Sequence, residues 1–599
     1  MIYHCEDHTC NYWDEGEKLP ERCPQCGRKL LRANEADMTG DDWTALGNTL
    51  WDAEASDKKR MVDCFRKAAY LGSAWGVCNL GICMEQGNGV EADPVQAFWL
   101  YQQAVEMGSL NAVCCLGVCY QYGIGTAPDA KQAAELYCKA AEYGSPRGQM
   151  LLARAFHDGI GVEADAAEAV YWVRAAAYQR YGEGMHRLGV CYEYGDGVEQ
   201  NWERAVHWFC EAAESGVGVA MTDLGYCYEK GCGVEQSWEQ AFSWYRRGAE
   251  CGDPVSMCNL GLCYQMGYGV EQNWQEAIKW YEQGAQCGDL QSMHNLACCY
   301  EGGEGVEQNE DRAFYWYRRS AEGGNGSAMC NLGRCYKRGY GVEQNWQEAV
   351  KWYEQGAQCG NLQSMHNLAC CYEHGEGVEQ NMTEAIRWYT AAAEGGNADD
   401  MYELGWQYDH GEGVEQDMKK AICWYERAAE QNHPAAMNSL GECYAMGRGV
   451  PRDLETAMEW YRRAAELGEA MADYNMGWHL EQAGKLSEAY THYRKAADGN
   501  DDSAWWALGR FYENGVVVAQ DGKEARRCYE TGEKLGSVKC KMRLARCKLL
   551  GIGGRRAKKA GLDLCRQALE LAKESSEKED YGYEAEMNLL RRTIAENES

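Results

Sequence analysis

Four cysteines near the start of the chain have the spacing of a metal site. Cys5 and Cys10 are separated by four residues, Cys23 and Cys26 by two, and twelve residues lie between the pairs. Cysteine pairs on short loops can present four thiolates to one tetrahedral ion. A segment of about 35 residues seldom folds on an apolar core alone, so a bound metal would staple it. We therefore expect residues 1–35 to form a metal-binding module with these four ligands.

The metal could be zinc or iron. The segment resembles zinc ribbons and the small rubredoxin-like domain of rubrerythrins, and such rubredoxin-like domains carry one iron for electron transfer. The residues that carry the resemblance are Tyr12, Gly16, Pro20 and the Cys-Pro-Gln-Cys-Gly turn at residues 23–27. The chain departs from the rubredoxin-like pattern in its first cysteine pair, and His4 and His8 could compete as ligands. Because closed four-cysteine sites are usually zinc sites, we expect zinc in a structural or docking role, with iron and electron transfer as the alternative.

A second set of metal-binding residue types falls on one predicted helix. The set consists of His366, Cys370, His374 and, 36 residues further on from His374, His410. Histidines and a thiolate on one helix face can hold a transition metal. Residues 267–309 and 339–381 are near-duplicates that differ at three positions, and the earlier copy has Gly302 where the later one has His374. Chance placement among twelve histidines is therefore the interpretation we prefer.

Catalytic motifs are weak in this sequence. A serine nucleophile of the penicillin-binding type needs Ser-x-x-Lys at a helix start. The tetrads that begin at Ser56 and Ser575 have these residue types but lack the accompanying motifs. About one such match is expected by chance at average composition. The Gly-x-Gly-Val segments follow predicted helices, not strands, so they are not phosphate-binding fingerprints. We predict no catalytic residues and no enzymatic activity.

The elements that would position these residues recur with a period of 36 residues. The marker is a Leu-Gly pair or a near equivalent, and every interval from the copy at Leu80 to the copy at Met476 is 36 residues. The fifteen markers are Leu46, Leu80, Leu116, Leu152, Leu188, Leu224, Leu260, Leu296, Leu332, Leu368, Leu404, Leu440, Met476, Leu508 and Leu544. Such a period indicates stacked supersecondary units, each of which buries its apolar face against its neighbours.

One repeat illustrates the unit. Apolar residues in Met257–Met266 recur at helical spacing, and two glycines, Gly267 and Gly269, then favour a tight reversal. Asn273 is a good N-cap for a second helix over Trp274–Gln286. The unit is therefore a helix-turn-helix, and the fold is all-α.

The repeats resemble the Sel-one-like repeat, a longer-looped relative of the tetratricopeptide repeat. The resemblance rests on the joint recurrence of Leu-Gly, Ala-x-x-Trp-Tyr and the Gly-x-Gly-Val loop, seen for example at residues 87–90, 195–198, 267–270 and 447–450. It covers about residues 40–573 and implies a right-handed α-solenoid of about 15 repeats. Two units depart from the pattern, at residues 482–485 and 551–554. Members of this family generally work as adaptors and share no catalytic residues.

Tetratricopeptide geometry, by analogy, places a partner-binding groove on the first helices. Its lining rows lie two before and two, five and six after the marker leucine. The five-after row is acidic and the two-after row is largely apolar, which would suit a peptide with basic residues. The predicted groove residues are Glu85, Glu193, Glu229, Leu262, Glu301, Glu373, Trp406 and Asp409. We expect a protein–protein interaction scaffold or adaptor whose partners are proteins or peptides.

Composition limits the other partners. Ninety-two acidic and 59 basic residues give a net charge of −33, which repels nucleic acid and anionic membranes. No apolar run approaches the ~18 residues of a membrane helix, and the first residues lack a hydrophobic signal region. We expect a cytoplasmic monomer that does not insert into membranes.

The 32 cysteines fit the same interpretation. Nine lie three residues after a marker leucine, where a buried thiol can serve as a small hydrophobic group. They are Cys83, Cys119, Cys191, Cys227, Cys263, Cys299, Cys335, Cys371 and Cys443. The cysteine-rich secreted Helicobacter members of the family instead carry disulfide ladders and are associated with weak β-lactam hydrolysis, which is the alternative activity implied by the resemblance. Only Cys251 and Cys258 approach the ladder arrangement here, so we expect reduced thiols.

The end of the chain departs from the repeat. Residues 574–580 are highly charged, and Tyr583–Ala595 then has the apolar spacing of one more helix. A solenoid needs a terminal unit with one polar side, so we expect residues 580–599 to cap the last repeat. Arg591 and Arg592 leave a docking peptide as the alternative.

Overall fold

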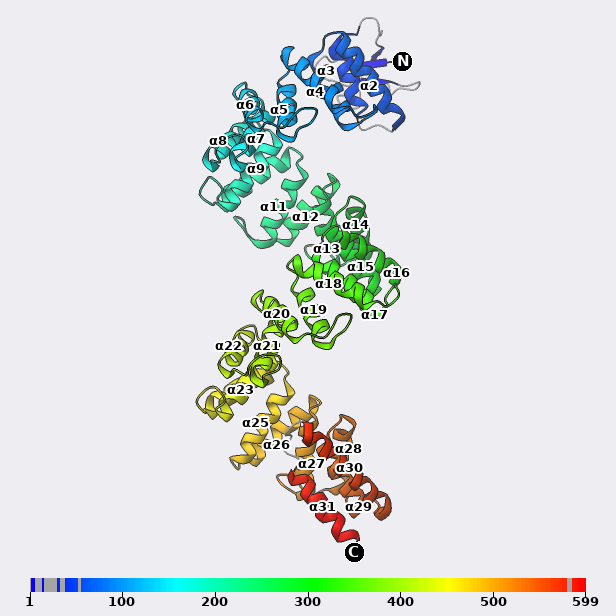
Figure 1. Cartoon of the computed structure of the whole chain (residues 1–599), viewed down its shortest axis with the longest axis vertical. Helices are drawn as coiled ribbons and strands as arrows, with labels where there is room; N and C mark the ends of the chain where they lie inside the picture. The colour runs from blue at the N-terminus through cyan, green and yellow to red at the C-terminus, as the bar shows by residue number, and fades with distance from the viewer. Residues whose placement is uncertain are drawn as a thin grey trace. The chain divides into compact units, whose positions relative to one another are not determined.

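A computed structural model describes residues 2–5, 13–15, 30–32, 38–51, 55–578 and 584–598 (Figure 1). It divides into two units, residues 1–309 and 310–599, each of which is described by itself. The helices of unit 1 are α1 (Gly40–Thr49), α2 (Ala55–Tyr70), α3 (Ala74–Gln86), α4 (Pro94–Glu106), α5 (Leu110–Tyr122), α6 (Ala130–Glu142), α7 (Pro146–Asp158), α8 (Ala166–Tyr178), α9 (Gly182–Tyr194), α10 (Trp202–Glu214), α11 (Gly218–Lys230), α12 (Trp238–Glu250), α13 (Pro254–Met266), α14 (Trp274–Gln286) and α15 (Leu290–Gly302).

Unit 2 continues the same alternation of helices. Its helices are α16 (Glu310–Glu322), α17 (Gly326–Arg338), α18 (Trp346–Gln358), α19 (Leu362–His374), α20 (Met382–Glu394), α21 (Ala398–His410), α22 (Met418–Glu430), α23 (Pro434–Met446), α24 (Leu454–Glu466), α25 (Ala470–Gln482), α26 (Leu486–Asp498), α27 (Asp502–Asn514), α28 (Gly522–Lys534), α29 (Val538–Leu550), α30 (Lys558–Lys578) and α31 (Glu584–Glu598). None of the helices in the described parts of the chain has the length and hydropathy needed to cross a membrane.

Three short strands precede the helices. The strands β1 (Ile2–Cys5), β2 (Trp13–Glu15) and β3 (Leu30–Arg32) form an antiparallel sheet in the order β2-β1-β3. Of the predicted metal ligands, Cys5 ends β1, whereas Cys10, Cys23 and Cys26 lie outside the described residues. The metal site therefore stays a prediction.

Local signals in the sequence set the helix ends. The second helix predicted at Trp274–Gln286 is α14, and the Asn273 side chain caps it by accepting from the amides of Gln275 and Glu276. The preceding helix begins three residues before the predicted Met257, at Pro254, because Asp253 caps it and proline suits the first helical turn. The prediction of a helix-turn-helix unit is thus confirmed with a longer first helix.

The loop between the two helices closes on the preceding repeat. In the loop of α9, a Cβ on Gly197 would lie 2.2 Å from the carbonyl oxygen of Ala166, and its φ is +67°. Only glycine meets both conditions without strain. Gln200 then donates from Nε2 to the Glu193 carbonyl oxygen at 2.8 Å, which ties the loop to the end of the helix.

Buried tyrosines fill the core. Most repeats contribute one, from the second of their two helices. The Tyr245 ring lies against the marker glycine of its repeat, so that a Cβ on Gly225 would lie 2.5 Å from a ring carbon. The nine cysteines of the three-after row are all buried, as predicted. Burial raises the pKa of most of these thiols, for example that of Cys83 to about 11.

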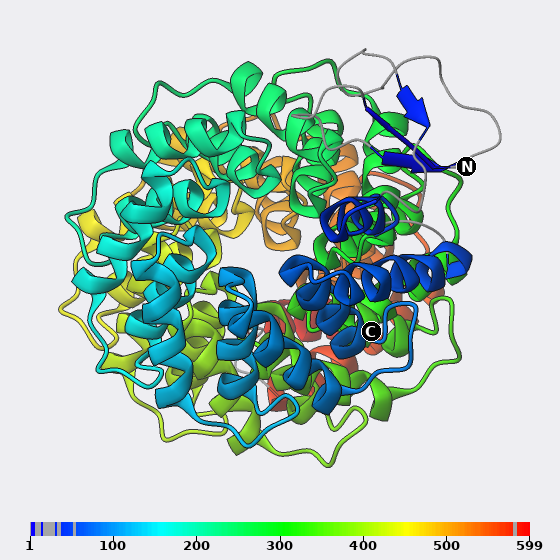
Figure 2. The same ribbon diagram turned by 90° about the horizontal axis from the view of Figure 1, so that it is seen from above.

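Neighbouring repeats stack through both helices. Within each unit, a second helix packs between its own first helix and the first helix of the next repeat, as α4 does between α3 and α5. Some first helices of successive repeats also contact each other, for example α5 with α7. In Figure 2 the helices of unit 1, blue to green, follow one another along an arc. The prediction of an all-α solenoid of repeats is confirmed.

Candidate functional site

The acidic row predicted for the groove has an internal role. In several repeats its carboxylate accepts a hydrogen bond from the buried tyrosine of the same repeat. The pairs are Tyr101–Glu85 (2.6 Å), Tyr245–Glu229 (2.8 Å), Tyr389–Glu373 (2.6 Å) and Tyr425–Asp409 (3.5 Å). Burial raises the pKa of these tyrosines, so each phenol stays protonated and able to donate.

The row is not uniformly available to a partner. Asp409 is buried, at 4% exposure, and Arg448 donates to it at 3.0 Å. Glu193 differs because its repeat has Phe209 in place of the tyrosine. Burial, and then the nearby Asp223, raise the pKa of Glu193 above its ordinary value. Glu301 is half-buried.

The two apolar residues predicted for the groove lie in different units. Leu262, in α13 of unit 1, is 40% exposed. Trp406, in α21 of unit 2, is half-buried and stacks on His410 with ring centroids 4.3 Å apart. They do not belong to one described surface.

Of the four residues of the second set, His366 and Cys370 contact each other, whereas His374 and His410 turn back to their own helices. His374 Nδ1 donates to the carbonyl oxygen of Cys370 at 3.0 Å, and His410 Nδ1 donates to that of Trp406 at 2.9 Å. These bonds hold the two rings against their own helices. Across the part of the chain that the structure describes, no group of three or more His, Cys, Asp or Glu side chains is placed to hold a metal ion.

Unit 1 contains a pocket that sequence reasoning missed. Val173 of α8 occupies the position of the core tyrosine, and the ring that would pack between α7 and α9 is replaced by a cavity of about 420 Å³. Its floor is apolar and includes Ala153, Val170 and Val173. The signal was present in the sequence, because the tyrosine position can be followed repeat by repeat.

The rim of the pocket is charged. His157 lies between two carboxylates, Asp158 at 2.7 Å and Asp196 at 3.2 Å. Two arginines on the rim instead donate to neutral partners: Arg147 to the Asn111 side chain at 2.7 Å and Arg154 to the Tyr122 hydroxyl at 3.1 Å. An apolar floor beneath arginines is suited to an apolar group that carries an anion.

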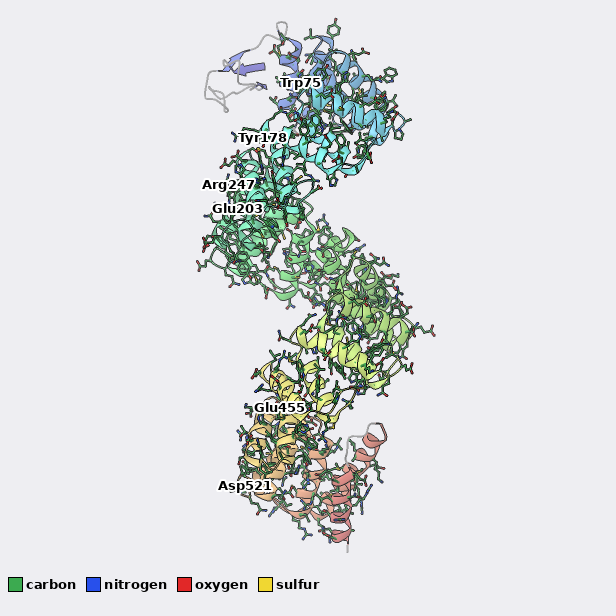
Figure 3. The ribbon with its side chains drawn as sticks, turned by 90° about the vertical axis from the view of Figure 1, so that its left-hand side faces the viewer. Trp75, Tyr178, Glu203, Arg247, Glu455 and Asp521 are labelled. Atoms are coloured by element: carbon green, nitrogen blue, oxygen red, sulfur yellow. The ribbon has the colours of Figure 1, made fainter. Side chains whose placement is uncertain are left out.

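Large apolar side chains are exposed on the first helices on either side of this pocket. They lie on the predicted groove rows of α5, α9, α11 and α13. These residues, here called the unit 1 face, are Tyr122 (60% exposed), Tyr194 (73%), Tyr226 (43%), Leu262 (40%) and Met266 (51%). Tyrosine and methionine are enriched at protein interfaces because they offer large contact areas. Tyr178, labelled in Figure 3, is equally exposed at 73% but belongs to a second helix.

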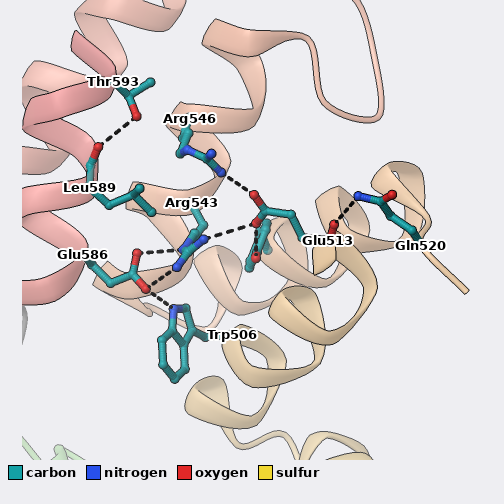
Figure 4. Close-up of polar contacts among 9 residues, drawn as sticks. Trp506, Glu513, Gln520, Arg543, Arg546, Glu586, Leu589 and Thr593 are labelled. Carbon is teal, nitrogen blue, oxygen red and sulfur yellow. Dashed lines mark hydrogen bonds and ion pairs between the residues drawn. The ribbon is translucent and has the colours of Figure 1, made fainter. Parts of the chain in front are cut away.

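The last repeats are covered by a polar network (Figure 4). Glu586 of α31 accepts two bonds from Arg543, both at 2.7 Å, and one from the Trp506 indole at 3.2 Å. Arg543 and Arg546 also pair with Glu513, the five-after residue of its repeat. Met587 and Leu590 of α31 are buried in the same apolar cluster as residues of α29 and α30. The helix predicted at Tyr583–Ala595 is therefore present, with the bounds Glu584–Glu598.

Comparison with known proteins identifies the repeat. A family model described as Sel1 repeat matches the chain thirteen times. The matched residues are 76–109, 112–145, 146–181, 182–217, 218–253, 254–289, 290–325, 326–361, 362–397, 398–433, 434–469, 470–501 and 504–537. A search of curated proteins gave no match.

Two solved structures are similar. A protective antigen present in uropathogenic Escherichia coli strains, which displays an SLR fold, is 32% identical over 75% of this chain and 97% of its own, with a TM-score of 0.50. A Sel1 repeat protein from Oxalobacter formigenes is 33% identical over 41% of this chain and 96% of its own, with a TM-score of 0.37.

Proposed function

Because the chain belongs to the Sel1 repeat family, whose solenoids are typical of protein–protein interaction scaffolds, we propose that it is a non-enzymatic scaffold that binds protein or peptide partners along its first helices. We place this function in the cytoplasm. The observation that carries the proposal is the unit 1 face, where five large apolar side chains are exposed on four first helices of one unit. Soluble proteins seldom expose such a series without a binding role.

The charge around the unit 1 face specifies the partner further. Glu229 adjoins Lys230, whose ammonium group lies 2.8 Å from that carboxylate, and Lys230 lies over the Tyr226 ring. Glu193 precedes the exposed Tyr194 in α9. Together with the strongly negative net charge, these carboxylates favour a partner segment that combines apolar and basic residues. The pocket at Val173 would admit one apolar side chain of that segment.

A structural or docking zinc site at Cys5, Cys10, Cys23 and Cys26 belongs to the same proposal. It is supported by ligand spacing alone. Iron-based electron transfer at these cysteines and weak β-lactam hydrolysis are the alternatives. The first rests on the rubredoxin-like resemblance alone. The second has no motif in its favour, because the Ser-x-x-Lys tetrads at Ser56 and Ser575 lack their companion motifs.

A pair of tyrosine substitutions tests the scaffold. Tyr194→Glu places a charge on the unit 1 face, whereas Tyr178→Glu places the same charge at an equally exposed tyrosine of a second helix. Each tagged full-length protein would be purified from its native organism and the bound proteins quantified. We expect Tyr194→Glu to lose partners that the wild type and Tyr178→Glu retain. Equal retention by both variants would contradict binding at the unit 1 face.

A further inference from the structure

A cysteine, a histidine and an aspartate form a hydrogen-bonded series in unit 2. The Cys370 sulfur lies 3.6 Å from Nε2 of His366, and Nδ1 of His366 lies 2.8 Å from Oδ1 of Asp400. The imidazole thus connects a half-buried thiol on its own helix, α19, with a carboxylate on the next first helix, α21. Nucleophilic cysteines are activated by this geometry, in which a base contacts the thiol and a third group orients the base.

Asp400 departs from the rule that every other repeat from α3 onward follows. Its position, four before the marker leucine, packs against the second helix of the preceding repeat, so it takes a small residue: a Cβ on Gly148 would lie 2.5 Å from Cβ of Ala140. The other repeats have Gly76, Ala112, Gly148, Gly184, Ala220, Ser256, Ser292, Ala328, Ser364, Ala436, Ala472, Ala504 and Cys540. Asp400 is completely buried, and its Oδ2 has no hydrogen-bond partner among the described groups. A buried carboxylate is costly, so burial raises the pKa of Asp400, while the hydrogen bond from His366 acts in the opposite direction.

The surroundings of His366 favour its protonated form. Hydrogen bonds to Asp400 and then to Cys370 raise the pKa of His366 to about 10, against the effect of burial. Glu403, also on α21, is half-buried, and burial raises its pKa. On the side of α20, the Tyr389 hydroxyl lies 3.4 Å from the Cys370 sulfur and donates to Glu373.

These groups act in opposite directions on the sulfur. Glu373 and Glu403 disfavour a second negative charge in this region, whereas the imidazolium favours it. The imidazolium contacts the sulfur directly, and Glu373 is separated from it by the Tyr389 hydroxyl.

We propose that Cys370 is a nucleophilic thiol, activated by the His366 side chain that Asp400 orients, and that it is a site of thiol–disulfide exchange with small disulfides. In the step, the Cys370 sulfur attacks one sulfur of the disulfide, and a new S–S bond forms as the old one breaks. The departing sulfur leaves as a thiolate and takes a proton from water. The sulfur of Cys370 is oxidised and the departing sulfur is reduced, so no further oxidant is needed.

The duplicated segment supplies an internal control. Cys298 lies 3.6 Å from Nε2 of His294, as in the later copy, but the sequence position that corresponds to Asp400 is Ala328. Cys298 is also the more exposed of the two cysteines. Accessibility alone would therefore make Cys298 react faster, whereas the proposal requires the reverse order.

The experiment is a competition inside one protein. The folded full-length chain reacts with a limiting amount of 4,4′-dithiodipyridine at pH 6, and mass spectrometry then quantifies the modified tryptic peptides 280–312 and 352–387. These contain Cys298 and Cys370, respectively, and differ in mass. We expect Cys370 to react about tenfold faster than Cys298, because Asp400 orients the histidine that contacts Cys370, whereas Ala328 stands at the matching position for Cys298. Fragmentation within each peptide assigns the modified cysteine.

Variants complete the test. Asp400→Asn and His366→Gln should each lower the Cys370 rate about tenfold and leave the Cys298 rate unchanged. Equal rates of the two cysteines in the wild type would overturn the proposal. The wild-type comparison needs no substitution, so a variant that fails to fold does not remove the test.

Discussion

The hydroxyl of a buried tyrosine needs an acceptor, and the residue five positions after the marker leucine supplies it. Two repeats use an amide for this purpose: Tyr137 donates to Gln121 at 2.7 Å and Tyr281 to Gln265 at 2.6 Å. In these repeats the contact therefore needs an acceptor at this position and not a charge. Leaving a buried hydroxyl without a partner costs more free energy than the hydrogen bond itself contributes. This explains why the residues five after the marker leucine are mostly polar.

The Tyr245 hydroxyl should contribute measurably to stability. Tyr245→Phe removes the hydroxyl that donates to the Glu229 carboxylate. It should lower the local free energy of unfolding by about 1–2 kcal/mol. Tyr461→Phe is the matched control, because its repeat has Ala445 at the acceptor position, and it should cost less. Amide hydrogen exchange in α11 and α23 would report both effects. Equal losses of protection would contradict the assigned role of the carboxylate.

Asp501 should make unit 2 less stable above pH 6. It caps α27 by accepting from the Ala504 amide at 2.7 Å, and burial raises its pKa from 3.8 to about 6. Because the folded-state pKa is the higher one, the neutral acid is favoured in the folded protein. That stabilisation is complete below about pH 4 and is lost as the pH rises through about 6. Asp501→Asn keeps a capping oxygen without the charge, and should gain about 1 kcal/mol at pH 7.5 and little at pH 4.

Thermal unfolding at the two pH values would measure this difference. A gain of the same size at pH 4 and pH 7.5 would show that the substitution acts through packing and not through ionisation of Asp501. The helical circular dichroism signal before melting serves as the control for folding.

At the scale of the elements, periodicity alone predicted the helix-turn-helix unit, because the packing of each repeat is local. Two features could not be obtained in that way. The first helix begins earlier than expected, since its first turn carries Pro254 behind an aspartate cap and no apolar periodicity. The pocket at Val173 arises because valine replaces the core tyrosine of other repeats. This replacement leaves the apolar periodicity of the sequence unchanged. Similarly, Asp400 could be recognised as exceptional only once its position was known to be buried.

Removal of the C-terminal helix should expose the last repeat. Met587 and Leu590 are buried at 4% and 2% exposure, and deletion of residues 581–599 would uncover the apolar residues of α29 and α30 that they contact. We expect the truncated protein to self-associate in size-exclusion chromatography with light scattering, because an uncapped solenoid end is apolar. The control is Glu586→Gln, which weakens the ion pair with Arg543 but keeps the apolar cover. A truncated protein that stays monomeric and loses its partner would favour the docking interpretation of this helix.

At the scale of the whole molecule, the thiols test the predicted compartment. In the described part of the chain, none of the 28 cysteines from Cys64 to Cys565 forms a disulfide. Titration of the native protein under denaturing, non-reducing conditions should find most of them as thiols, as expected for a reducing compartment. Recovery mainly as disulfides would instead place the protein among exported cysteine-rich relatives.

Metal removal tests the N-terminal prediction separately from the solenoid. Chelation should release one zinc ion per chain and unfold residues 1–35, since binding energy in small metal modules is essentially folding energy. The helical circular dichroism signal should change little, because the helices from Gly40 onward are built by repeat packing. A red protein would identify iron, and collapse of the helical signal would show that the module supports the solenoid.

The stacking of each helix pair on the one before it also determines how the chain can fold during synthesis. Within each unit, as a nascent chain leaves the ribosome, every new pair meets an apolar face that the preceding pair has already formed. Folding can therefore proceed from the first repeat toward the last at the pace of translation, without waiting for distant segments. At any moment only the newest repeat is uncovered, and the growing end stays uncovered until α31 is made. Chaperones that shield apolar surfaces would thus have a single moving site to protect, whatever the number of repeats.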